Sequence, residues 1–227
     1  MKYVRTYKKI VFSLLFFILI SLSSYAEGFF SSLAWSFSAS VYTIPEDNGS
    51  EGAPTPVLIS AGTAAAYQIR DTFWMELSLD FYGTFYGYSE SLDRAVPVTQ
   101  ENRWSFVLGS ILGIQGVYKY DINDKFTLRA YGGPAADMRI CFIASGIEGT
   151  ERETASQKNS DIAAYFWGKG RWFTPVAGFG MDYAALDNLK LGLDIRIWMP
   201  AYKLWTGESL PFIEGWRFAA GIRLSLR

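Results

Sequence analysis

The chain has 227 residues; 50% of them are hydrophobic and 17% are aromatic, whereas only 19% are charged. It contains no histidine and a single cysteine, which excludes Ser-His-Asp and Cys-His catalytic sets, histidine-based metal sites and an internal disulfide. The 21 basic and 22 acidic residues nearly balance, so the strongly basic face of a nucleic-acid-binding protein is not expected. A chain of this length is compatible with one all-β barrel domain.

Residues 1–26 are predicted to be a secretory signal peptide that is cleaved after Ala26. Basic residues at positions 2, 5, 8 and 9 precede an apolar stretch at 10–22, and small residues follow at Ser24 and Ala26, the two positions that a signal peptidase reads. The alternative is a transmembrane helix, but the apolar stretch is shorter than the ~20 residues that a helix needs to span a bilayer. Residues 27–227 are then expected to form the single domain of an exported protein.

Beyond the signal, apolar and small or polar residues alternate with a period of two, which is the periodicity of β-strands. Large apolar side chains such as Trp35 and Phe37 take the odd positions of the first segment, and small side chains such as Ser36 and Ser38 take the even positions. Eight segments show this pattern, and they are residues 33–41, 57–70, 73–88, 104–120, 126–142, 173–183, 189–199 and 216–226.

Short and long connections alternate between these segments. Tight turns bearing Asp or Asn are expected at residues 71–72, 121–124 and 185–188. Long polar loops are expected at 43–56, 89–102, 144–161 and 200–215. This order predicts an up-and-down antiparallel sheet with all tight turns at one end, and eight strands suffice to close it into a barrel without unpaired edges.

The two strand faces predict that this barrel is embedded in a membrane. One face carries about five large apolar side chains per strand, too many to fill the narrow interior of an eight-stranded barrel. The other face carries small residues such as Ser36, Ser38 and Gly62, whereas a solvated surface would carry many Lys and Glu. We therefore expect the apolar face to contact lipid, in contrast to a soluble lipocalin-type barrel, whose apolar face points inward.

Aromatic residues gather near the expected strand ends. Tyr67 and Phe73 flank a tight turn, and Tyr42 and Trp216 flank long loops. Two aromatic belts that bound an aliphatic band are typical of the two lipid–water interfaces. The predicted fold class is therefore all-β, an eight-stranded antiparallel up-and-down transmembrane β-barrel.

Charged residues on the small-residue face are expected to point into the lumen. Buried charges need partners, and arginine, which predominates here, pairs well with carboxylates. We therefore interpret these residues as an ion-paired plug, in preference to a wide water channel or a set of catalytic carboxylates. The residues are Glu76, Asp80, Arg129, Asp137, Arg139, Asp182, Lys190, Asp194, Arg196, Arg217 and Arg223.

Two prolines fall at nearly the same height on adjacent predicted strands, Pro134 after the second tight turn and Pro175 before the third. Proline donates no hydrogen bond to a β-ladder. One interpretation is a lateral seam in the barrel wall near the loop-side edge of the membrane; the other is that both prolines lie above the bilayer. Residues 162–172 either extend the sixth strand or form a short helix, and no role is assigned to Cys141.

Near the C-terminus, Gly221 followed by Leu224 and Leu226 resembles the signal by which the barrel assembly machinery recognises outer-membrane barrels. Residues 178–196 resemble the penultimate hairpin of small outer-membrane barrels of the OmpA, OmpX and OmpW type, and the length is most similar to OmpW. The resemblance implies the outer membrane of a diderm bacterium, with outer-membrane lipids and the assembly machinery as partners and no cofactor.

Two classes of function remain, one implied by the resemblance and one suggested by the long polar loops. Enzymes of the same architecture use histidine, so a non-enzymatic protein is expected. The likeness to OmpW implies a narrow, porin-like passive conduit for small apolar molecules that leave sideways through the wall. The alternative is a surface-display, adhesion or structural protein, in which the long loops contact host ligands from a rigid scaffold.

Overall fold

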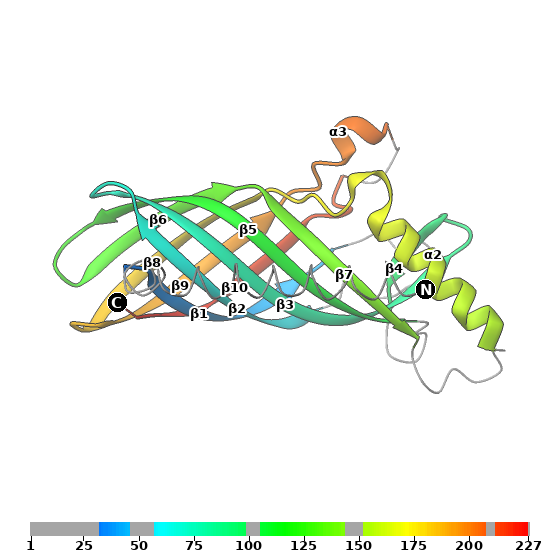
Figure 1. The fold of residues 1–227 in the computed structure, drawn as a ribbon, viewed down its shortest axis with the longest axis horizontal. Coiled ribbons are helices and arrows are strands. Elements are labelled where there is room, and N and C mark those ends of the chain that lie inside the picture. The colour runs from blue at the N-terminus through cyan, green and yellow to red at the C-terminus, as the bar shows by residue number, and fades with distance from the viewer. Residues whose placement is uncertain (1–31, 46–56, 99–104, 144–151, 208–211, 227) are drawn as a thin grey trace, which may run out of the picture. The chain divides into compact units, whose positions relative to one another are not determined.

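The computed structural model describes residues 32–45, 57–98, 105–143, 152–207 and 212–226. The chain separates into Met1–Leu33 and Ala34–Arg227, and the second unit forms one closed antiparallel β-barrel (Figure 1). The predicted signal peptide, residues 1–26, lies outside the described residues and stays a prediction.

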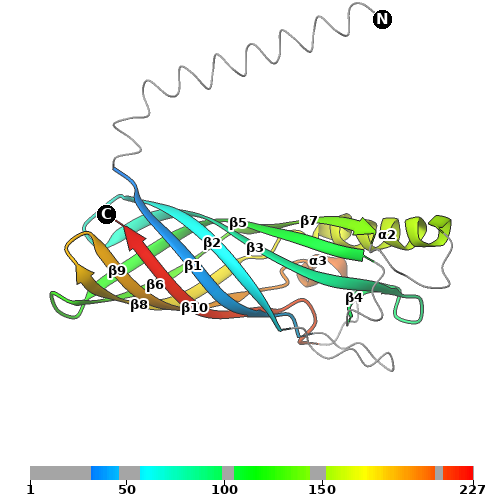
Figure 2. The ribbon, with the colours of Figure 1, turned by 90° about the horizontal axis from the view of Figure 1, so that it is seen from below.

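Eight strands form the wall, with β6 and β7 counted as one strand that is interrupted at Pro134. Each pairs with its neighbours in antiparallel register, and the β3–β5 and β1–β10 pairings close the ring. Figure 2 shows β1 lying between β2 and β10. The predicted fold class is confirmed. The strands are β1 (Ala34–Thr43), β2 (Val57–Gln68), β3 (Phe73–Ser89), β5 (Ser105–Asp121), β6 (Phe126–Gly133) with β7 (Ala135–Ile143), β8 (Val176–Leu186), β9 (Leu189–Trp198) and β10 (Arg217–Leu226).

Strand parity separates the two faces of the wall, because successive side chains of a strand point to opposite sides. In β9, Leu193 and Ile195 face outward and are 59% and 65% exposed, whereas Asp194 between them is only 4% exposed. The same alternation runs through β3, where Leu79 faces outward beside Leu112 of β5 and Asp80 faces the lumen. Small inward residues leave room for the charged side chains of neighbouring strands.

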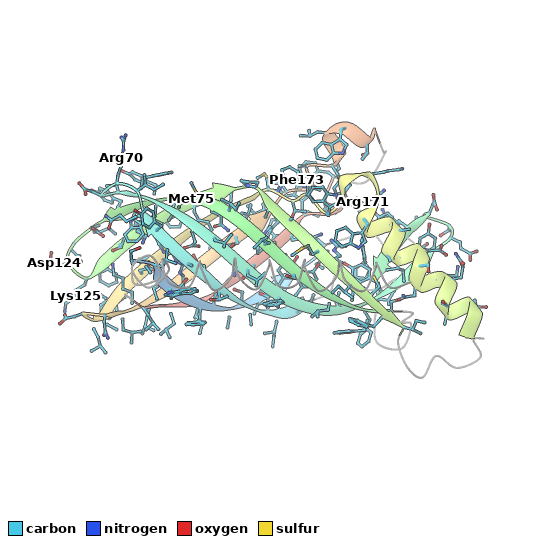
Figure 3. The ribbon with its side chains drawn as sticks, viewed as in Figure 1. Arg70, Met75, Asp124, Lys125, Arg171 and Phe173 are labelled. Atoms are coloured by element: carbon cyan, nitrogen blue, oxygen red, sulfur yellow. The ribbon has the colours of Figure 1, made fainter. Side chains whose placement is uncertain are left out.

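The connections lie as the alternation of short and long segments predicts. The tight turns after β2, β5 and β8 share one end of the barrel, where Figure 3 labels Arg70, Asp124 and Lys125. The long connections meet at the other end, which we call the loop end. They carry β4 (Arg94–Pro97), α2 (Arg152–Trp167), the short 3₁₀ helix η3 (Gly168–Gly170) and α3 (Lys203–Thr206). None of the helices in the described part of the chain is long and apolar enough to cross a membrane.

Two expectations about the loop end were wrong. A polar loop was expected through residue 161, but α2 begins at Arg152 and ends at Trp167, so only the first part of 162–172 is α-helical. The strand expected at 173–183 begins only at Val176, because η3 and Pro175 interrupt regular pairing before it. Helix α2 and the late start of β8 depend on contacts between segments that are distant in the sequence. The periodicity of a single segment does not predict such contacts.

At the loop end, β3, β5 and β7 run beyond the closed ring, and β4 pairs with β3 to extend them into one sheet. Tyr86 of β3 pairs with Pro97 of β4 and with Ser105 of β5, and Ser105 pairs in turn with Ile143 of β7. Helix α2 packs on the lumen-side face of this loop-end sheet (Figure 1). The contacts bury Ile162 and Phe166 of α2 against Tyr86, Ala95 and Val107.

Candidate functional site: the filled lumen and its two ends

The outer surface of the barrel is apolar over its whole circumference. Side chains such as Phe81, Leu112, Ile195 and Ile222 stand exposed on different strands. A monomer in water rarely exposes a continuous apolar patch of more than a few hundred Å². The outer face is therefore the lipid-facing surface of a membrane barrel, as the sequence predicts. Tyr42 is an exception among the expected interface aromatics, because its even position in β1 turns it into the lumen, where it is buried.

The tight-turn end opens into a vestibule of about 260 Å³. Lys119, Lys190 and Asp121 line it together with apolar side chains. The Lys119 ammonium lies 3.5 Å from the ring centroid of Trp74, a cation–π contact. Lys190 Nζ is 3.5 Å from the Thr127 hydroxyl, and within the described residues Lys190 joins no ion pair, unlike the other charged residues predicted to face the lumen.

Above the vestibule, ion pairs cross the lumen. Arg223 forms two parallel contacts with Glu76, and Nη1 lies 3.1 Å from Oε1. Arg129 lies between two carboxylates, with Nε 2.7 Å from Asp182 and Nη2 2.9 Å from Asp194. These contacts join β3 to β10, which lie on either side of β2 and β1, and join β6 both to its neighbour β8 and to β9 beyond it.

The middle of the lumen contains a further ion pair and almost no free space. Arg196 Nη1 lies 2.7 Å from both carboxylate oxygens of Asp80, and its Nη2 donates a hydrogen bond of 3.0 Å to Ser40. The Tyr131 hydroxyl donates to Asp194 at 3.1 Å. The cavity among these groups has a volume of about 20 Å³, room for one or two water molecules.

Toward the loop end, one carboxylate gathers three partners. Asp137 accepts a hydrogen bond of 2.6 Å from Arg139 Nε and one from the Tyr82 hydroxyl, which lies 3.0 Å from both carboxylate oxygens, and it pairs with Arg217. Beside this group the lumen is filled by packed rings. Tyr42 stacks on Tyr82 at 5.0 Å between ring centroids, and Trp198 meets Tyr42 edge-on at 5.5 Å.

The aromatic filling was not predicted from the sequence, although the signal was present. Tyr42, Tyr82, Tyr131 and Trp198 all occupy inward positions of their strands. Strand parity places these rings in the lumen, but only small and charged residues were predicted to face it.

Helix α2 covers the ion pairs at the loop end. The Arg139 guanidinium lies 4.1 Å from the ring centroid of Phe166, and Trp167 Nε1 donates a hydrogen bond of 3.2 Å to the Arg139 carbonyl. Nearer the middle of α2, Lys158 pairs with Glu90 in the connection between β3 and β4. The hydrogen bond from Lys158, together with its charge, holds the pKa of Glu90 below its ordinary value.

The arrangement offers the chemistry of a plug. Each carboxylate that the sequence predicts to face the lumen pairs with at least one arginine, and no three His, Cys, Asp or Glu side chains of the described residues group as the ligands of a metal ion would. Removing one partner of such a buried pair leaves an uncompensated charge, which costs far more than the pair contributes. The ion pairs therefore favour one closed packing of the lumen.

The predicted lateral seam at Pro134 and Pro175 stays a prediction, and the backbone hydrogen bonds around the two prolines give it no support. Below the prolines, β6 and β8 remain paired up to Gly133 and Val176. Above them, Thr174 N–H donates to the Ala135 carbonyl at 2.9 Å and Asp137 N–H donates to the Trp172 carbonyl at 2.7 Å. The Pro134 carbonyl accepts from Ile114 N–H at 3.0 Å, and the Pro175 carbonyl accepts from Met199 N–H at 2.8 Å. The wall is thus hydrogen-bonded on both sides of the two prolines.

Comparisons with known proteins agree with this geometry. No protein-family model matches the sequence, and a search of curated proteins gives no match. The structure is similar to the crystal structure of Neisserial surface protein A (NspA), with a TM-score of 0.50, 10% sequence identity and coverage of 86% of this chain and 96% of that chain.

Two other solved structures are similar at lower scores. For the outer membrane protein OprG from Pseudomonas aeruginosa the TM-score is 0.49 and the identity 9%, over 86% of this chain and 96% of that chain. For Ail, the attachment invasion locus protein of Yersinia pestis, in complex with the heparin analogue sucrose octasulfate, the values are 0.43 and 10%, over 85% and 94%. At such identities the likeness concerns the fold. The chain is an eight-stranded membrane β-barrel with the fold of the small outer-membrane barrel proteins.

Proposed function

We propose that the protein is a closed, non-enzymatic barrel of the outer membrane of a diderm bacterium, and that it acts by displaying its loop end at the cell surface. The signal peptide is removed, the barrel assembly machinery inserts the chain, and outer-membrane lipid then surrounds the apolar outer face of the barrel. The groups that meet a partner are those of the loop end, which projects from the membrane on a rigid base.

The observation that carries this proposal is the filled lumen. The ion pair of Arg196 with Asp80 leaves a cavity of only about 20 Å³ in the middle of the barrel. The buried rings of Tyr42, Tyr82 and Trp198 pack beside the ion pairs nearer the loop end. A solute would have to displace both layers, so the lumen supports a scaffold more than a channel.

The construction of the loop end gives further support. Long connections that only close a barrel need no secondary structure, whereas here β4 and α2 form a packed unit with its own buried side chains. The Ser105 hydroxyl donates a hydrogen bond of 2.6 Å to Asn159, which fixes α2 to the start of β5. A rigid platform lowers the ordering entropy that binding by loops otherwise costs.

The passive conduit for small apolar molecules has less support. It requires either an open lumen or a gap in the wall. In the described residues, the middle of the lumen holds a cavity of only about 20 Å³, and the wall is hydrogen-bonded on both sides of Pro134 and Pro175. The nearer likeness to OmpW among small barrels stays a prediction from length.

Conductance in planar lipid bilayers separates the two functions. The purified, folded barrel is added to both sides of a bilayer that conducts when a general porin is added afterwards. We expect no discrete current steps from this protein, because the ion pairs and rings fill its lumen. Steps that disappear when the sample is heat-denatured, or heat-sensitive uptake of an apolar solute by proteoliposomes, would contradict the closed barrel.

Binding of protein-containing liposomes to cells and to matrix proteins tests the display function. Liposomes that contain the full chain are compared with liposomes in which the chain has residues 46–55 and 145–150 replaced by short Gly-Ser turns, on cultured epithelial cells and on immobilised matrix proteins. A matched control carries Asp124→Asn and Lys125→Ala at the tight-turn end. We expect attachment to be lost only with the loop replacements. Attachment equal to that of protein-free liposomes would count against display.

A further inference from the structure

One corner of the loop end exposes large apolar side chains on a built base. We call it the aromatic corner and define it as Trp172, Leu204, Trp205, Phe212 and Trp216. Leu204 is 88% exposed, Phe212 81% and Trp205 54%. Exposure of a contiguous apolar patch to water is unfavourable, so these side chains are expected to contact another surface.

The aromatic corner continues the lipid-facing surface of the barrel. Phe218 takes an outward position of β10, paired with the equally outward Ile197 of β9. Trp216 stacks on Phe218 with ring centroids 6.4 Å apart, and Phe212 meets Trp216 at 5.7 Å. A row of rings thus leads from the wall that contacts lipid to the exposed tip.

A second row of rings reaches the corner from β8. Phe173, which bridges to Ala136 of β7 just before β8 begins, contacts Trp172 at 6.1 Å and Trp205 at 6.3 Å between ring centroids. The Trp205 indole N–H donates a hydrogen bond of 3.0 Å to the Lys169 carbonyl. A Cβ at Gly170, whose φ is +75°, would lie 3.0 Å from the same indole ring, so the backbone there is shaped to receive Trp205.

The remaining side of the corner is held by a buried ion pair. Glu214 lies between the exposed Phe212 and the half-buried Trp216, and its carboxylate is 3.2 Å from Arg94 of β4. The Lys203 ammonium donates a hydrogen bond of 3.2 Å to the Phe212 carbonyl. The apolar tips are therefore presented by a fixed structure.

The direction of α3 distinguishes it from α2. Helix α2 continues beyond the end of the barrel, whereas α3 stands out sideways from the wall at the level of the loop end (Figure 1). Figure 3 places Arg171 and Phe173 at its base. A group that projects sideways from a membrane barrel, just above its lipid-facing band, meets the membrane surface.

We propose that the aromatic corner is a lateral foot that lies in the headgroup region of the leaflet at the loop end. Tryptophan and lysine together are the residues of that region: the indole has an apolar body and a polar N–H, and the ammonium reaches the headgroup phosphates. Here the Lys203 ammonium lies beside Phe212, at the carbonyl of that residue. The foot fixes the depth and tilt of the barrel, and it is independent of whether the loop end also binds a ligand.

A docked protein, including a second copy of this chain, is the alternative occupant. The membrane is favoured because the row from Phe218 through Trp216 to Phe212 is continuous with the surface that lipid already covers. Binding of a protein partner would not require this continuity with the lipid-facing surface. The Lys203 ammonium beside the aromatic side chains is a feature that favours lipid headgroups.

Site-directed fluorescence tests the foot. In a Cys141→Ser background, a single Leu204→Cys variant carries an environment-sensitive dye, and the barrel is reconstituted in vesicles of phosphatidylcholine and phosphatidylglycerol. Quenching is measured with aqueous iodide, with a nitroxide on the lipid headgroup and with a nitroxide deep in the acyl chain. Ser160→Cys on the exposed face of α2 serves as the aqueous control, and Leu193→Cys in the lipid-facing wall as the membrane control.

The foot predicts loss of iodide quenching at Leu204, a blue-shifted emission, and stronger quenching by the headgroup nitroxide than by the acyl-chain nitroxide. Iodide quenching at Leu204 equal to that at Ser160 would overturn the proposal. Protection from iodide and from both lipid quenchers would overturn it too, because it would mean that protein covers the corner. Heat-modifiable migration in electrophoresis confirms beforehand that each labelled barrel is folded.

Discussion

The lumen arginines determine what a single substitution costs. Arg196 is nearly buried and meets Asp80, a residue 116 positions away in the sequence. Its second amino group donates a hydrogen bond of 3.0 Å to the Ser40 hydroxyl, and Asp80 is its ion-pair partner. A buried guanidinium without its carboxylate retains its charge and loses its compensation.

We therefore expect Asp80→Ala to lower the free energy of unfolding by about 3–5 kcal/mol. The double variant Asp80→Leu with Arg196→Met removes both charges and should recover most of that loss. Lys190→Ala, at a lumen position without an ion pair, is the control and should cost less than ~1 kcal/mol. Urea unfolding in lipid vesicles, followed by tryptophan fluorescence, measures all three. A similar loss in the single and double variants would show that packing, and not charge, is responsible.

At the scale of single elements, helix α2 is held by a small set of contacts at its C-terminal end. Ile162 and Phe166 lie one turn apart and are both buried on the loop-end sheet. Phe166 contacts Tyr86 edge-on at 4.8 Å and lies under the Arg139 guanidinium. The N-terminal half of the helix is held by the hydrogen bond of Ser105 to Asn159 and by the pair of Lys158 with the exposed Glu90, which contributes little.

Phe166→Ala should therefore release α2 while the barrel stays folded. Deleting a buried phenylalanine costs about 3–5 kcal/mol, more than a short helix with few other contacts retains. Limited proteolysis of the reconstituted barrel should show faster cleavage within Arg152–Trp167, with unchanged heat-modifiable migration. Ser156→Ala, on the exposed face of the same helix, is the matched control. Equal cleavage rates in the two variants would mean that α2 is anchored elsewhere.

The elements that the sequence predicts are those whose contacts repeat along the strand. The period of two locates the wall strands and the inward direction of Asp80, Asp137 and Arg196, because a strand alternates whatever its neighbours are. The partner of each charge depends on how far neighbouring strands are staggered, which no single strand encodes. A short helix was one of the two alternatives for 162–172, but the start of α2 at Arg152 was not predicted, because its sequence is mainly polar and its buried apolar residues are few: Ala155, Ile162 and Phe166.

At the scale of the whole molecule, the orientation of the two faces decides where the protein resides. Leu112 of β5 pairs with Leu79 on one side and Ala136 on the other, in the middle of the outer apolar band. Tyr120 faces outward on the same strand but lies next to the tight-turn end. The two positions therefore sample different depths of one lipid-facing surface.

We expect Leu112→Arg to cost about 2–4 kcal/mol and Tyr120→Arg about 0–1 kcal/mol, because the cost of a lipid-facing charge falls from the bilayer midplane to the interface. Equilibrium unfolding in vesicles provides the comparison. Equal costs at the two positions would place the midplane elsewhere, and no cost at either would contradict a lipid-facing β5.

The distribution of charge along the chain has a consequence for biogenesis. Carboxylates of early strands, Glu76 and Asp80 in β3, are neutralised by arginines of the last two strands, Arg223 and Arg196. A nascent polypeptide that stops before β9 would carry these carboxylates without their arginine partners. Insertion of such an incomplete barrel would bury uncompensated charges and is therefore unfavourable. Maturation should then be all-or-none: the final hairpin arrives, the acids are compensated, and the cylinder locks in one concerted step.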